Sequence, residues 1–215
     1  MMYEWVYRKL DEDEKIAKEI GFNPYYMEIE SGLEDRLLMG KRRIIDLASN
    51  NYLGLAADPK VKEAVIKVVE KYGASLCGTP IATGTTELCS RLERHLSQFV
   101  GLEDAILFPS CYQANNGLFS CIADKNDLIV VDRFAHSSLI QGIKAVGCKI
   151  RPFLHNNLEH LENILKRSSK FTNVFVVTES VFSTDGTIAP FEEIVRLCKK
   201  YGAVPVVDDS HGIGV

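Results

Sequence analysis

Two carboxylates and an imidazole follow one short apolar run near the end of the sequence. Val206 and Val207 are followed by Asp208, Asp209, Ser210 and His211. At the end of a buried strand, these residue types can keep an acid ionised beside a cation and place a histidine nearby. A solvated pair of aspartates at a polar strand end is the ordinary alternative. A metal site is another, although no further ligand cluster accompanies these residues.

Three other segments carry polar side chains directly after apolar runs. Residues 110–115 lead through a small-residue turn into a helical pattern, and free N–H groups at a helix N-terminus suit a phosphate. His136 closes the segment 132–136 at the opening of another helix. Residues 178–186 form a turn that ends in glycine and contains Ser183. Taken singly, each segment has an ordinary explanation: helix capping for 110–115, a structural histidine for 132–136 and turn capping for 178–186.

Alternating helical and apolar segments from residue 58 onward predict an α/β fold, in which helices cover a parallel sheet. The expected strands are 105–108, 128–131, 174–178 and 204–207, and the expected helices are 59–72, 86–100, 112–122, 137–146, 158–166 and 191–201. Ligands of such sheets bind outside the carboxyl ends of the strands. The four polar segments are therefore expected to meet at one edge of the sheet.

The composition and charge of the chain argue against nucleic-acid and membrane partners. The chain of 215 residues is 46% hydrophobic and 25% charged, and its net charge of −4 comes with scattered Lys and Arg. No basic footprint for nucleic acid or an anionic membrane is present. The first residues lack the layout of a secretory signal, and no apolar run approaches the roughly 20 residues of a membrane span. We expect a cytoplasmic protein with no nucleic-acid or membrane partner.

The beginning of the chain differs from the rest. Residues 1–45 are expected to form an N-terminal arm, with a helix over 11–20 and irregular structure at 23–26. Residues 46–215 are expected to form one large domain. The six cysteines include no C-x-x-C pair, which argues against a disulfide framework or a structural metal.

Five motifs, in order and at suitable separations, resemble the α-oxoamine synthase family of pyridoxal-phosphate enzymes. They are Ser49–Leu55, Ser110–Asn115, Asp132–His136, Val181–Gly186 and Val207–Gly212. The resemblance implies the type I pyridoxal-phosphate transferase fold, with a mixed, mostly parallel sheet flanked by helices, in a homodimer. It implies an acyltransferase that condenses a small amino acid with an acyl-CoA. An aminotransferase or a lyase on the same fold is an alternative. A Ser/His/Asp hydrolase is disfavoured, because no G-x-S-x-G motif occurs.

The resemblance also implies catalytic roles for three residues. Asp208 would pair with the pyridinium nitrogen of the cofactor and keep it protonated. His211 would hydrogen-bond the ring hydroxyl oxygen, and His136 would stack on the ring face.

Further residues are implied as binding groups. Cys111 and Tyr112 would offer backbone N–H groups to the phosphate. Glu179 and Ser183 would complete the polar wall of the cofactor site. Asn50 would help to hold the substrate carboxylate.

The sequence departs from the family pattern in two places. The segment 77–85 lacks the arginine that the family usually has there, which leaves substrate recognition at this segment open. The cofactor-binding lysine of the family lies a few tens of residues beyond the Asp-x-x-His segment, and no lysine here occupies the matching position. We therefore expect the large cofactor-binding domain to be incomplete, truncated before this lysine and before the C-terminal small domain. The chain alone is expected to be inactive, and a catalytically inactive fragment is an alternative function.

Overall fold

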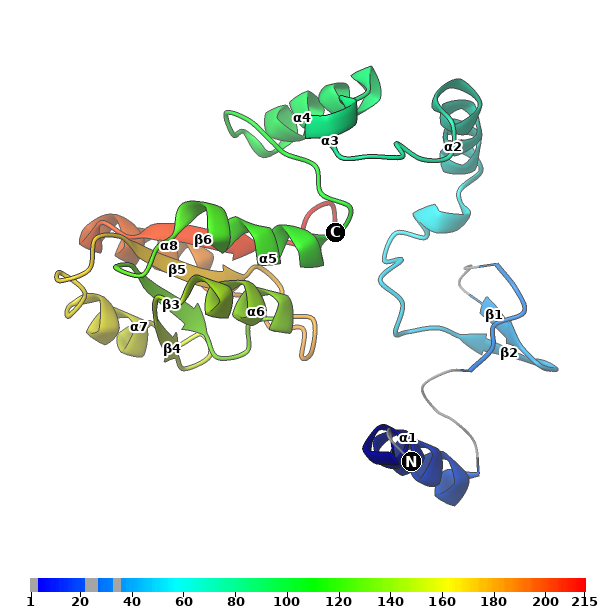
Figure 1. Ribbon diagram of the computed structural model, residues 1–215, viewed down its shortest axis with the longest axis horizontal. Coiled ribbons are helices and arrows are strands. Elements are labelled where there is room, and N and C mark those ends of the chain that lie inside the picture. The colour runs from blue at the N-terminus through cyan, green and yellow to red at the C-terminus, as the bar shows by residue number, and fades with distance from the viewer. Residues whose placement is uncertain (1–3, 22–26, 33–35) are drawn as a thin grey trace. The chain divides into compact units, whose positions relative to one another are not determined.

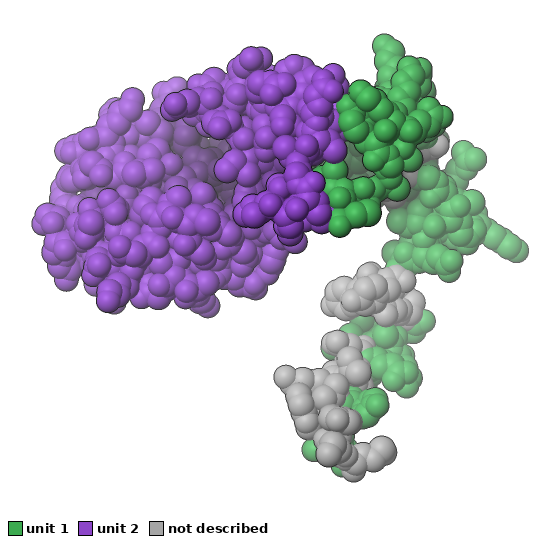
Figure 2. Space-filling model, turned by 45° about the horizontal axis from the view of Figure 1, so that its top comes forward, with its two compact units in different colours: residues 1–77 green, residues 78–215 purple. Residues whose placement is uncertain are grey.

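The computed structural model describes residues 4–21, 27–32 and 36–215. These residues divide into two compact units, 1–77 and 78–215 (Figure 2). The expected boundary between the N-terminal arm and the large domain, at residue 45, does not coincide with the division at residue 77. The domain boundary therefore stays a prediction. The irregular structure expected at 23–26 lies outside the described residues. Within the described ranges, no helix is long and apolar enough to cross a membrane.

The described residues of the first unit form two helices, a hairpin and one short 3₁₀ turn. Its elements are α1 (Glu4–Ile20), β1 (Arg36–Met39), β2 (Arg42–Ile45), η1 (Leu55–Ala57) and α2 (Pro59–Tyr72). Helix α2 is confirmed with its predicted cap, because the Asp58 carboxylate accepts hydrogen bonds from the N–H groups of Lys60 and Val61 at 2.8 and 3.1 Å. The predicted helix over 11–20 is also confirmed and begins earlier, at Glu4. The antiparallel hairpin β1–β2 was not predicted, since its strands are only four residues long.

The second unit is a four-stranded parallel sheet with helices on both faces (Figure 1). Its elements are α3 (Pro80–Thr83), α4 (Glu87–Val100), α5 (Cys111–Ile122), β3 (Leu128–Asp132), α6 (Ser137–Val146), β4 (Lys149–Phe153), α7 (Leu158–Leu165), β5 (Val174–Glu179), α8 (Phe191–Tyr201) and β6 (Val204–Asp208). The strand order is β4-β3-β5-β6, and every neighbouring pair is parallel.

Alternating side chains of β3 and β5 divide the core of this unit into two layers. Leu128 and Val130 pack with residues of α7 and α8 on one face of the sheet. Ile129 and Val131 pack with residues of α5 and α6 on the other. Because both faces are covered, β3 and β5 are buried along their whole length, as the uninterrupted apolar runs predicted.

One predicted strand is absent, and one strand was not predicted. Residues 105–108 do not form a strand, and Ile106 and Phe108 are 76% and 48% exposed. A strand needs a hydrogen-bonded neighbour, and no strand of the described residues pairs with this run. Strand β4 was not predicted, because its sequence, KIRPF, contains two cations and a proline. Such residues are tolerated because β4 is an edge strand.

A glycine allows α5 and α6 to pack closely together. A Cβ atom at Gly142 of α6 would lie 2.9 Å from the Cα of Asn116 in α5 and closer still to the carbonyl oxygen of Asn115. Both contacts are with backbone, so a flexible side chain cannot relieve them. The glycine therefore fixes the separation of the two helices whose N-termini border the candidate site described below.

Gly142→Ala is expected to lower the free energy of unfolding by about 1–3 kcal/mol, because α5 must move away from α6. Gly117→Ala is the matched control: its Cβ would meet nothing closer than 3.6 Å, and alanine favours a helix interior. This control should be neutral or stabilising in the same urea titration. Equal stability of the two variants would contradict the close approach.

Candidate active site

A small pocket lies at the carboxyl ends of β3, β5 and β6, beside the N-termini of α5 and α6. It has a volume of about 70 Å³ and is lined by Cys111, Tyr112, Asn115, His136, Ser138, Glu179, Asp208, Ser210 and His211. The structure thus brings together six of the residues predicted from four segments of the sequence. This is the arrangement expected when parallel strands end at one edge of a sheet.

Asp208 forms the floor of the pocket and is 9% exposed. One carboxylate oxygen accepts a hydrogen bond from the side-chain amide of Asn115 at 2.7 Å. The other accepts from the backbone N–H and the hydroxyl of Ser210 at 3.0 and 2.6 Å. Burial acts to raise the pKa of Asp208, but the hydrogen bonds from Ser210 and Asn115 outweigh it and hold this pKa below its usual value. Asp208 is therefore an ionised acid at neutral pH.

The N-terminus of α5 forms one side of the pocket. Ser110 is its N-cap, and the hydroxyl of Ser110 accepts a hydrogen bond from the N–H of Gln113 at 3.2 Å. Burial of the sulfur raises the pKa of Cys111 above its usual value, and the charge of Asp208 raises it further, although a hydrogen bond from Ser210 opposes both. Cys111 is therefore a neutral thiol at neutral pH.

His136 is the N-cap residue of α6 and also touches Glu179. The ring nitrogen Nδ1 of His136 accepts a hydrogen bond from the N–H of Ser138 at 3.2 Å and lies 2.7 Å from the Ser138 hydroxyl. The backbone N–H of His136 donates to the carboxylate of Glu179 at 2.6 Å. The ring of Tyr112 approaches that of His136 edge-on, with centroids 6.5 Å apart.

Glu179 ends β5 and is 3% exposed. Burial raises its pKa above the usual value, and the hydrogen bond from the N–H of His136 only partly offsets this. The charge of Asp208 raises the pKa of Glu179 further. The pocket thus contains two carboxyl groups whose pKa values are shifted in opposite directions, a feature of functional sites more often than of ordinary polar surface.

Two predicted residues are not among those that line the pocket. Ser183 is exposed in the turn after β5, although its backbone N–H acts to lower the pKa of Glu179. Asn50 belongs to the unit of residues 1–77, and its role stays a prediction.

Three residues of the pocket carried no predicted role: Asn115, Ser138 and Ser210. Asn115 lies four residues after Cys111 and so shares its helix face, which periodicity could have indicated. Its amide links the pocket floor to α6, donating to Asp208 and to the Ser138 hydroxyl, the latter at 3.0 Å. Ser210 follows Asp208 by two residues, the spacing of an Asx-type turn.

The metal-site alternative finds no support in the described part of the chain. No group of three or more His, Cys, Asp or Glu side chains there is placed to hold a metal ion. Asp209 instead accepts a hydrogen bond from the hydroxyl of Ser180. A larger hollow of about 770 Å³ lies at the amino ends of β3 and β4 and shares no residue with the pocket.

Comparison with known proteins identifies the class of protein. Residues 42–215 match the family model for aminotransferase class I and II, and the chain belongs to this family. It is 36% identical over 214 residues to 8-amino-7-oxononanoate synthase of Bacillus pumilus (strain SAFR-032), covering 100% of this chain and 54% of that protein. It is 38% identical over 186 residues to a putative 8-amino-7-oxononanoate synthase of Bacillus cereus (strain G9842), covering 86% and 47%.

Solved structures agree with this assignment. Serine palmitoyltransferase of Sphingomonas wittichii superimposes with a TM-score of 0.90 at 31% identity, over 97% of this chain and 53% of that one. A serine palmitoyltransferase structure with a TM-score of 0.89 and 30% identity was determined with PLP. These relatives confirm the predicted type I fold and the likeness to α-oxoamine synthases. The chain spans about half the length of the relatives that it matches.

Proposed function

We propose that this chain is the cofactor-binding part of a pyridoxal-phosphate-dependent acyltransferase that condenses a small amino acid with an acyl-CoA. The observation that carries the proposal is Asp208, a buried carboxylate kept ionised at the floor of the pocket by three hydrogen-bond donors. An acid in this state can hold a proton on a pyridine nitrogen. The likeness to 8-amino-7-oxononanoate synthase and serine palmitoyltransferase supports the proposal.

The residues of the pocket fit the cofactor in charge and chemistry. Asp208 would accept from the ring nitrogen, and His211 would hydrogen-bond the ring hydroxyl oxygen. His136 would lie against the ring face, while the backbone N–H groups of Cys111 and Tyr112 would hold the phosphate at the positive end of α5. When bound, pyridoxal phosphate supplies an electron sink for the Cα of the amino acid.

The remaining parts of the proposal rest on the family resemblance. Asn50 would hold the substrate carboxylate, and Glu179 with Ser183 would complete the polar wall beside His136. We also propose that the protein works as a homodimer in the cytoplasm.

The proposed activity is tested in the full-length protein loaded with pyridoxal phosphate. Glycine, alanine or serine is supplied with an acyl-CoA, and free thiol is assayed. Thiol should appear only when the amino acid and the acyl-CoA are both present. Transfer of the amino group to a 2-oxo acid, with no thiol release from any acyl-CoA, would contradict the proposal and favour the aminotransferase alternative.

The phosphate site is tested by two substitutions at Cys111. Cys111→Ser should change the Kd for pyridoxal phosphate by less than about threefold, because the proposed donor is the main chain. Cys111→Pro should raise this Kd by about tenfold or more, because it removes a hydrogen bond to a charged group. Proline is favoured at the first position of a helix, and Ser110, at φ −156° and ψ 155°, is already extended as a residue before proline must be. A severe loss in Cys111→Ser would show that the thiol itself binds.

A further inference from the structure

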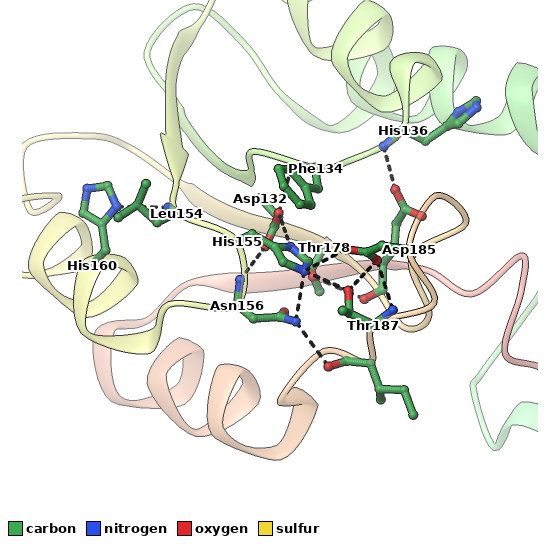
Figure 3. A network of polar contacts seen from close by, with 12 residues as sticks. Asp132, Phe134, His136, Leu154, His155, Asn156, His160, Thr178, Asp185 and Thr187 are labelled. Atoms are coloured by element: carbon green, nitrogen blue, oxygen red, sulfur yellow. Dashed lines mark hydrogen bonds and ion pairs between the residues drawn. The ribbon is translucent and has the colours of Figure 1, made fainter.

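His155 links two segments that both lead to the candidate active site, and no role has so far been given to it. Its ring nitrogen Nδ1 lies 3.0 Å from a carboxylate oxygen of Asp132, and Nε2 lies 2.8 Å from the hydroxyl of Thr187 (Figure 3). Asp132 ends β3 and is fully buried, while Thr187 belongs to the turn after β5. One imidazole therefore spans the space between these two segments.

Two aromatic side chains fix the plane of the His155 ring. Phe134 stacks on it, with ring centroids 4.4 Å apart and planes 19° apart. Phe182 meets it edge-on, at 4.5 Å and 88°. Phe134 comes from the same segment as Asp132, and Phe182 from the same turn as Thr187. Nε2 also lies 4.0 Å from a carboxylate oxygen of Asp185 in this turn. Each segment is therefore held to the imidazole by polar contacts and one aromatic contact.

Both segments act on Glu179 through backbone N–H groups. The segment 132–136 finishes with His136, whose backbone N–H donates to Glu179 at 2.6 Å. The turn 182–187 is closed by the hydrogen bond from the N–H of Phe182 to the carbonyl of Thr187, at 2.9 Å. Within this turn, the N–H of Ser183 acts on Glu179 and lowers its pKa. The backbone groups that act on Glu179 thus come from the two segments that His155 joins.

We propose that His155 is a positioning residue that fixes Glu179 and the backbone of His136 at the border of the pocket. The inference rests on the proposed function in so far as these two residues border the cofactor. His155 is not needed to satisfy Asp132, because this carboxylate also accepts from the N–H groups of Phe134 and Asn156 at 2.8 and 3.0 Å. Loss of the imidazole is therefore expected to loosen the two segments and leave the buried acid paired.

Three substitutions separate positioning from general stability. His155→Phe keeps an aromatic ring between Phe134 and Phe182 but removes the polar contacts with both segments. Thr187→Val keeps the shape of the threonine and removes its hydroxyl from His155 and from Asp185, so it affects the turn and not the segment 132–136. Thr187→Ser keeps the hydroxyl and is the matched control.

The readouts are residue-resolved hydrogen exchange and the Kd for pyridoxal phosphate. In His155→Phe, the amides of His136 and Ser183 should exchange about tenfold faster or more, while that of Val130 in β3 stays protected. The Kd should rise by a similar factor. Thr187→Val should speed exchange at Ser183 and leave His136 close to wild type. Thr187→Ser should resemble the wild type at both amides.

Unchanged exchange at His136 and Ser183 in His155→Phe would overturn the proposal. Faster exchange at every amide, including that of Val130, would also overturn it, because it would show a general structural role. If His155→Phe does not fold, unchanged exchange at Ser183 in Thr187→Val would likewise overturn it. Failure of the proposed function looks different, because the wild-type protein would then either not bind pyridoxal phosphate or bind it without releasing thiol from an acyl-CoA. The exchange pattern of the unliganded variants would be unaffected by that failure.

Discussion

Asp208→Asn is expected to lower the turnover of the full-length protein by about a thousandfold or more, which corresponds to about 4 kcal/mol in the activation barrier. A neutral amide cannot hold a proton on the ring nitrogen of the cofactor, so the electron sink is lost. The measurement is the rate of thiol release at saturating pyridoxal phosphate, amino acid and acyl-CoA. Turnover near that of the wild type would remove Asp208 from the proposed mechanism.

The structure adds a local cost to this substitution. All the hydrogen-bond partners of Asp208 from Asn115 and Ser210 are donors, so the NH₂ group of an asparagine would face a donor on one side. A loss of about 1–3 kcal/mol in the free energy of unfolding is therefore expected, and turnover must be compared well below the melting temperature.

Asp209→Asn provides the matched control for the loss of charge. It makes the same chemical change one residue away, at an exposed side chain that does not line the pocket. Turnover should remain close to that of the wild type. A comparable loss in both variants would indicate that the overall charge of this strand end matters and that Asp208 has no particular role.

The parts of the fold that sequence analysis predicted are those with strong local signals. Helix α2 was predicted from its cap at Asp58 and α4 from its apolar stripe, and β3 and β5 were predicted because strands buried on both faces read as continuous apolar runs. Strand β4 and residues 105–108 show the limit of this reasoning. Whether such a segment becomes a strand depends on a neighbouring strand, and a local pattern does not contain that information.

The same limit applies to the candidate site. Asp208, His136 and Glu179 lie in segments that were singled out because each follows an apolar run, and parallel strand ends must converge. Their individual roles were implied by the family resemblance. Periodicity could have placed Asn115 on the helix face of Cys111, but it does not reveal the partner of this side chain, and His155 lies in a loop that carries no such positional rule. Their partners, Asp208 and Asp132, are distant in sequence, and only the folded chain shows these contacts. Residues that orient other residues are therefore harder to predict than those proposed to touch the cofactor.

His136 has two separable roles, one as the cap of α6 and one beside the proposed cofactor. Its Nδ1 accepts from the N–H of Ser138, so His136→Ala removes a helix cap along with the ring. Losing a cap costs about 1 kcal/mol of stability. Asparagine is among the best N-cap residues, so His136→Asn should keep this stability while removing the imidazole. The backbone N–H that donates to Glu179 remains in both variants.

We expect both substitutions to raise the Kd for pyridoxal phosphate by about tenfold, because the ring that would stack on the cofactor is lost. Turnover at saturating cofactor should fall by about a hundredfold, because the cofactor ring is no longer held in its reactive orientation. The Kd, the thiol-release rate and the melting temperature are measured for each variant. Only His136→Ala should melt at a lower temperature than the wild type. If His136→Asn binds the cofactor and turns over like the wild type while His136→Ala does not, then capping of α6 is the whole contribution of His136, and the imidazole has no part in the chemistry.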